Sequence, residues 1–78
     1  MKIKANRTLD CLGLYCPEPV FKTRMELDEL KLGEVLEVVA DDPAAEEDFK
    51  RWAKRMGQHI LEFEKEGPKM RFLIEKVV

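Results

Sequence analysis

The sequence is poor in cysteine and histidine and carries almost no net charge. Its 78 residues include two cysteines and one histidine, and 14 basic against 16 acidic side chains give a net charge of −2. Such a chain offers no electrostatic reason to bind nucleic acid directly. In a reducing compartment, two cysteines are expected to be free thiols rather than a structural staple.

Metal-ligand spacing is also missing. The chain has no C-x-x-C pair and no paired histidines, so ligation of zinc or iron by Cys11, Cys16 and His59 is disfavoured. A Cys–His hydrolase is formally open, but no residue pattern supplies an oxyanion hole or an orienting acid. We expect no metal and no bound cofactor.

Long apolar runs, linkers and repeats are absent as well. Nothing approaches the length of a membrane span, and no apolar segment follows Met1–Lys4 to form a signal peptide. These features predict a cytoplasmic protein without membrane contact. From the length of 78 residues we expect a single domain, residues 1–78, with a small core, and we expect a monomer.

The most informative stretch is Leu14–Val20, in which Cys16 stands directly before Pro17. Proline is favoured at the first position of a helix, so we expect Pro17 at N1 and Cys16 at the N-cap. Pro17 and Pro19 remove two N–H donors and leave the Glu18 N–H as the nearest donor to the sulfur. Helix N-termini lower the pKa of a cysteine. The pattern therefore predicts a reactive thiolate at Cys16.

The hydrophobic periodicity predicts the element order βαβαββ. Asp42 is the expected N-cap of the second helix, Pro43 its first residue and Gly57 its end. The expected strands cover residues 2–10, 34–40, 59–66 and 69–78, and the expected helices cover residues 17–30 and 43–56.

Each expected helix has one apolar stripe, so both should cover the same face of the sheet in a two-layer α+β sandwich. The stripes are Val20, Thr23, Leu27 and Leu30 in the first helix, and Ala45, Phe49, Trp52, Ala53 and Met56 in the second. In the third strand Leu61 and Phe63 share a face. The last strand is apolar on both faces, which suggests a central place: Met70, Phe72 and Ile74 on one side, Leu73 and Val77 on the other.

With this order in place, the Cys16-Pro17-Glu18-Pro19 motif resembles the TusA/SirA/YedF family of small sulfur-carrier proteins. The C-P-x-P element with its upstream Gly-Leu pair is the specific part of the resemblance, which covers about residues 8–76. The other residues that carry it are Leu9-Asp10, Gly13-Leu14, Val20, Gly33-Glu34 and Asp41-Asp42-Pro43-Ala44.

This resemblance implies a fold like the C-terminal domain of translation initiation factor three, with a mixed sheet of strand order 1-2-4-3. It implies that Cys16 carries sulfane sulfur as a persulfide, supported by Pro17, Glu18 and Pro19. A cysteine desulfurase or rhodanese-like protein would donate the sulfur, and a thiol-bearing acceptor protein of the DsrE/TusD kind would receive it. The relay would serve 2-thiouridine synthesis in tRNA or related sulfur trafficking. Such a protein is a sulfurtransferase-type carrier rather than a turnover enzyme.

Cys11 departs from the commonest family pattern and leaves two interpretations open. It packs as a small residue at the end of the first strand, or it is a resolving thiol that forms a disulfide with Cys16. The second interpretation would make the protein a redox-responsive regulatory or interaction module, which is the main alternative to a sulfur carrier. An RNA-binding module rests on fold analogy alone and conflicts with the net charge.

Several charged residues also have two interpretations. Asp41 and Asp42 are better explained by helix capping than by metal binding. The basic side chains of the two helices form either a docking face or an ordinary solvated surface. These side chains are Lys22, Arg24, Lys50, Arg51, Lys54 and Arg55.

Overall fold

The computed structural model describes residues 4–78, which form four strands and two helices. In chain order the elements are β1 (Arg7–Cys11), α1 (Glu18–Asp28), β2 (Val35–Ala40), α2 (Ala45–Met56), β3 (His59–Glu66) and β4 (Lys69–Glu75). The first two residues of the expected N-terminal strand, 2 and 3, lie outside the described residues.

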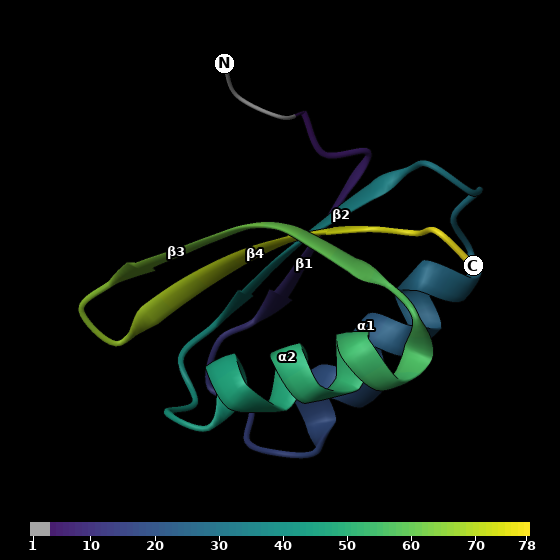
Figure 1. The fold of residues 1–78 in the computed structure, drawn as a ribbon. Helices are drawn as coiled ribbons and strands as arrows, with labels where there is room; N and C mark the ends of the chain where they lie inside the picture. Colours follow the sequence, from purple (N-terminus) through teal and green to yellow (C-terminus); the bar gives the residue numbers. More distant parts are fainter. Residues whose placement is uncertain (1–3) are drawn as a thin grey trace.

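The strands form one mixed sheet in the order β1-β2-β4-β3. β1 and β2 are parallel, whereas β4 pairs with β2 and β3 in antiparallel fashion. Figure 1 shows α1 and α2 together on one face of this sheet. The predicted two-layer α+β fold, with strand order 1-2-4-3 and a central β4, is confirmed.

An aromatic cluster fills the space between the sheet and the helices. Phe49 of α2 and Phe72 of β4 are both fully buried, and their ring centroids lie 4.6 Å apart. The ring centroids of Phe63 in β3 and Phe72 lie 5.0 Å apart, and the rings of Trp52 and Phe49 are nearly perpendicular with centroids 6.3 Å apart. Trp52 is 5% exposed, so its interpretation as a core residue is confirmed.

β1 is shorter than predicted at its N-terminal end. The Val35 N–H donates to the side-chain Oδ1 of Asn6 at 2.8 Å, and the Asn6 N–H donates to the Val35 carbonyl at 2.8 Å. The side-chain oxygen of Asn6 thus accepts a hydrogen bond that a backbone carbonyl of the strand would otherwise accept. The strand pairing begins at Arg7, which lies opposite Leu36.

The alternation predicted for β3 is broken by a β-bulge. Ile60 lies opposite Ile74 and Glu62 lies opposite Leu73, so Leu61 is an extra residue between the two pairs. Because a bulge shifts the side-chain alternation by one position, Ile60 rather than Leu61 joins Phe63 against the core. The prediction that Leu61 and Phe63 share the core face is therefore wrong.

Two further residues of the predicted apolar faces are exposed rather than buried. Met56 is the last residue of α2 and is 40% exposed, and Val77 follows the end of β4 and is 42% exposed. Leu73 is 2% exposed on the face of β4 that points away from the helices, flanked by Glu37 and Glu62 on the neighbouring strands. The apolar pattern of β4 is therefore explained by its central position.

α1 ends at Asp28 rather than at Leu30. The N–H groups of Glu29 and Leu30 donate to Glu26 and Leu27, three residues back instead of four, at 3.1 and 3.0 Å. This tightening of the chain is common at helix ends.

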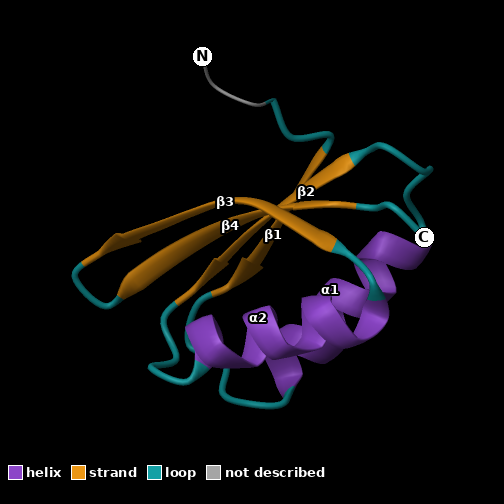
Figure 2. Cartoon of the chain, in the orientation of Figure 1, coloured by secondary structure: helices purple, strands orange, loops and turns teal. Residues whose placement is uncertain are grey.

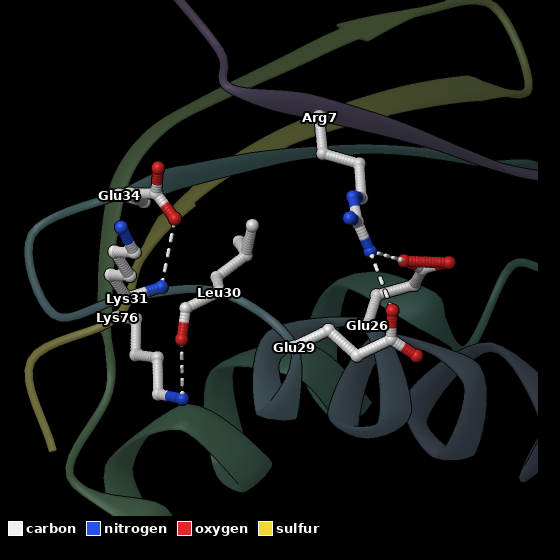
Figure 3. A network of polar contacts seen from close by, with 7 residues as sticks. All are labelled: Arg7, Glu26, Glu29, Leu30, Lys31, Glu34 and Lys76. Carbon is white, nitrogen blue, oxygen red and sulfur yellow. Dashed lines mark hydrogen bonds and ion pairs between the residues drawn. The ribbon is translucent and has the colours of Figure 1, made fainter.

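Side chains from other elements hold this end of α1 in place (Figure 3). Arg7 of β1 contacts Glu26 and Glu29 at 2.8 and 3.1 Å. Lys76, beyond β4, donates from Nζ to the Leu30 carbonyl at 2.8 Å. The first strand and the C-terminal segment thus both fix the position of α1.

Candidate functional site

The loops that precede the two helices meet at the carboxyl ends of strands β1 and β2. Because β1 and β2 are parallel, their carboxyl ends lie side by side, and the loop after β1 begins next to the loop after β2 (Figure 2). The Gly13 N–H donates to Oδ1 of Asp41 at 2.9 Å, and the Cys16 N–H donates to Oδ2 of Asp42 at 2.8 Å. Two aspartates of the second loop therefore fix the loop that carries Cys16.

Asp42 accepts hydrogen bonds from backbone N–H groups of both loops. Its Oδ1 accepts the Ala44 N–H at 3.0 Å, its Oδ2 accepts the Cys16 N–H, and its own carbonyl accepts the Ala45 N–H at 2.8 Å. The N-cap residue of α2 is Ala44, so the prediction of Asp42 as N-cap is wrong by two residues. A turn held by Asp42 comes first, and the helix starts only at Ala45.

α1 also begins one residue later than predicted. The Glu18 N–H donates to the Tyr15 carbonyl at 2.9 Å, and the first helical bond runs from the Phe21 N–H to the Pro17 carbonyl at 3.1 Å. Pro17 is therefore the N-cap residue, and the Cys16–Pro17 peptide bond is cis. The predictions of Cys16 as N-cap and of the Glu18 N–H as a donor to the sulfur are wrong, because that N–H already closes a turn.

The Cys16 thiol is exposed and has acidic neighbours. The carboxylate of Asp48 raises the pKa of Cys16 most, followed by desolvation and by the charge of Asp42; Arg51 opposes them. The predicted lowering of this pKa is therefore wrong. The carboxylates outweigh the helix end, whose first turn lacks an N–H at Pro19 and uses the N–H of Glu18 to close a turn.

Asp48 is the residue of this site that the sequence did not reveal. It lies in the first turn of α2, where its Oδ1 accepts a hydrogen bond from Arg51 at 2.6 Å. Its side chain is only 15% exposed, against 66% for Arg51. An acidic residue in the first turn of a helix is ordinary, so only its effect on the pKa of the Cys16 thiol distinguishes Asp48 from Glu46 and Glu47.

Cys11 lies in the core, whereas Cys16 is exposed. Its side chain is fully buried at the end of β1, opposite Ala40, and burial raises the pKa of its thiol. Both cysteines are free. These observations favour the packing interpretation of Cys11, and its role as a resolving thiol stays a hypothesis.

The basic residues of α2 are partly engaged within the chain. Lys50 pairs with Glu46 at 2.8 Å and lies 5.4 Å from the centre of the Phe63 ring, while Arg51 pairs with Asp48. His59, on β3, lies 3.8 Å from Glu75. Of the predicted basic residues, Arg51 is the one that acts on the Cys16 thiol.

Within residues 4–78, no group of three or more His, Cys, Asp and Glu side chains is arranged to hold a metal ion. Nor does that part of the chain contain a helix of the length and apolarity needed to cross a membrane.

Comparison with known proteins identifies the family. Residues 7–76 match the family described as sulfurtransferase TusA. The chain belongs to the TusA family. The sulfur carrier protein TusA of Allochromatium vinosum is 39% identical over 71 residues, which cover 91% of this chain and 93% of that protein. A relative from Archaeoglobus fulgidus is 49% identical over 72 residues, covering 91% and 94% of the two chains.

The fold is shared with a solved member of the same group. The crystal structure of a SirA-like protein from Desulfitobacterium hafniense superposes with a TM-score of 0.78 at 30% identity, covering 92% of this chain and 99% of that one. The predicted resemblance is thus confirmed at the level of family and fold, and the TusA family is one of sulfur carriers that work between donor and acceptor proteins.

Proposed function

We propose that this TusA-family protein carries sulfane sulfur as a persulfide on Cys16. The observation that supports this most is an exposed cysteine in a loop whose backbone is fixed at Gly13 and at Cys16 by the carboxylates of Asp41 and Asp42. A fixed backbone presents the sulfur at a constant position to a partner's thiol, while exposure lets that thiol approach.

The proposed cycle has two exchanges. A cysteine desulfurase or a rhodanese-like protein transfers its outer sulfur to Cys16, and a thiol-bearing acceptor protein of the DsrE/TusD kind then removes it. Pro17 and Pro19 stiffen the loop-to-helix junction, and Glu18 lies exposed beside it. No metal or cofactor takes part. The relay would act in the cytoplasm, where thiols stay reduced, and would serve tRNA 2-thiouridine synthesis or related sulfur trafficking.

The test is intact-protein mass spectrometry without reductant, after incubation with a cysteine desulfurase, pyridoxal phosphate and cysteine. We expect the wild type and Cys11→Ser to gain one sulfur, and Cys16→Ser to gain none while keeping its fold. Retention of sulfur loading by Cys16→Ser would contradict the proposal.

The same measurement distinguishes the sulfur carrier from the redox-module alternative. That alternative predicts the loss of two hydrogens upon oxidation, and this loss would require both Cys11 and Cys16. If the protein gains no sulfur, and loses two hydrogens only when both cysteines are present, it acts as a redox switch and not as a sulfur carrier.

A further inference from the structure

The two segments that meet at Cys16 carry acidic side chains and no basic ones. Residues 10–18 and 41–48 contain no lysine, arginine or histidine, although the whole chain has 14 lysines and arginines. The two segments hold seven of the 16 acidic side chains, so the other residues together are net positive. The seven are Asp10, Glu18, Asp41, Asp42, Glu46, Glu47 and Asp48. The negative charge of the chain is therefore concentrated around the Cys16 loop.

Ion pairs within the chain offset only part of this charge. Lys50 pairs with Glu46 at 2.8 Å, and Arg51 pairs with Asp48 at 2.6 Å. Three further carboxylates accept backbone N–H groups, which are neutral donors and leave the negative charge in place: Asp10, Asp41 and Asp42. The two that remain are exposed: Glu18 and Glu47.

The backbone N–H groups next to the sulfur are already used or missing. The Cys16 N–H donates to Asp42, and the Glu18 N–H donates to the Tyr15 carbonyl. Positions 17 and 19 are prolines, which have no N–H. In the free protein, water solvates a thiolate or persulfide anion at this exposed residue, and a docked partner displaces that water. The partner must then supply the positive charge that stabilises the anion.

The Cys16 loop also exposes two large apolar side chains. Leu12 is 42% exposed, and Tyr15, directly before Cys16, is 69% exposed. Exposed apolar groups with a charged rim are typical of surfaces that bind other proteins, and tyrosine is enriched among the residues that dominate such contacts. This observation is independent of the charges and indicates a protein partner.

We propose that residues 12–18 and the first turn of α2 form an acidic docking surface for partner proteins whose reacting cysteine is surrounded by basic side chains, with Tyr15 as the apolar anchor. This inference rests on the proposed function of Cys16 and adds the chemistry of its partners. Opposite charges speed the encounter and select against acidic proteins. The same charges oppose the pairing of two Cys16 loops from two copies of the chain.

Exchange of Cys16 with small disulfides measures the charge around the sulfur. Cystamine is cationic, 3,3′-dithiodipropionate is anionic and 2-hydroxyethyl disulfide is neutral, and each leaves a mixed disulfide that intact mass identifies. We expect the rate constants at pH 7 to fall from the cationic to the neutral to the anionic reagent, and to converge at high salt. Because the ratio compares reagents on one thiol, a change in the fraction of thiolate cancels.

Glu18→Gln should lower the ratio of the cystamine rate to the dithiodipropionate rate several-fold at low salt. Asp28→Asn is the matched control, because Asp28 is an exposed acid at the other end of α1, about 15 Å away along the helix. It removes the same charge from the chain and should leave the ratio unchanged.

Sulfur loading by a cysteine desulfurase tests the anchor. We expect the KM for the carrier to rise several-fold in Tyr15→Ser and at high salt, with kcat little changed. Leu32→Ser is the control, since Leu32 is 68% exposed, as Tyr15 is, but follows the far end of α1. It should keep the wild-type KM.

The outcomes are separable. A wild type that gains no sulfur from the desulfurase or from glutathione persulfide would overturn the proposed function of Cys16. A wild type that loads, but reacts equally with cystamine and dithiodipropionate or shows the same KM in Tyr15→Ser and Leu32→Ser, would overturn the acidic docking surface alone. A wild-type dimer in sedimentation that Tyr15→Ser converts to monomers would assign the surface to a second copy and contradict the proposal.

Discussion

Cys11 couples folding to pH through a single side chain. Burial raises the pKa of this thiol, so between the thiol pKa of the unfolded chain, about 8.5, and the higher folded value the folded protein keeps a proton that the unfolded chain loses. The stabilisation is complete below that window and is lost as pH rises through it. We expect the free energy of unfolding to fall above pH 8.5 by at most about 1.4 kcal/mol per pH unit from this group.

Urea denaturation of wild type and Cys11→Ala between pH 7.5 and pH 10 measures this effect. The variant keeps Cys16 and all lysines, so the difference between the two curves isolates Cys11. A difference that does not change with pH would show that the Cys11 thiol titrates alike in the folded and unfolded chains.

At the scale of single elements, α1 depends on a cation that comes from far along the chain. Lys76 donates to the Leu30 carbonyl, which lies past the end of α1 where carbonyl groups lack helical partners. We expect Lys76→Met to lower the free energy of unfolding by about 1 kcal/mol. Lys31→Met is the control, since Lys31 uses its backbone N–H toward Glu34 rather than its side chain. Equal losses in the two variants, measured by urea denaturation, would argue against the Lys76 contact.

The elements themselves could be predicted from the sequence, whereas their details depend on contacts between distant residues. The buried stripe of Phe49, Trp52 and Ala53 repeats at helical spacing, and the two faces of β4 place it centrally. The bulge at Leu61 left no such signal, because an alternating pattern does not record an inserted residue.

The candidate site could likewise be predicted only in part. Cys16 could be singled out because proline and cysteine chemistry are local properties of the sequence. Asp48 could not, because its effect on the pKa of the Cys16 thiol arises only when the fold brings the first turn of α2 near the loop that carries Cys16. The direction of the Cys16 pKa was missed for that reason: the helix end is visible in the sequence, and the opposing carboxylates are not.

At the scale of the whole molecule, stability rests on the contact between β4 and α2. Phe72 is fully buried between Phe49 and Phe63. We expect Phe72→Ala to cost about 3–5 kcal/mol, a large part of the roughly 4–12 kcal/mol typical of a chain this size. Phe21→Ala, at a side chain 59% exposed, should change stability by less than about 0.5 kcal/mol. Thermal and urea unfolding test this; similar losses in both variants would contradict the proposed core.

The sheet order also determines how copies of the protein behave toward one another. β1 and β3 are its two edges, where unpaired backbone groups can recruit another chain. β1 is only five residues long, and β3 combines the bulge at Leu61 with Glu62, Glu64 and Glu66. Bulges and repeated charges of one sign both oppose the docking of an incoming strand. Both edges of the sheet are therefore protected against pairing with a strand of another copy of the protein.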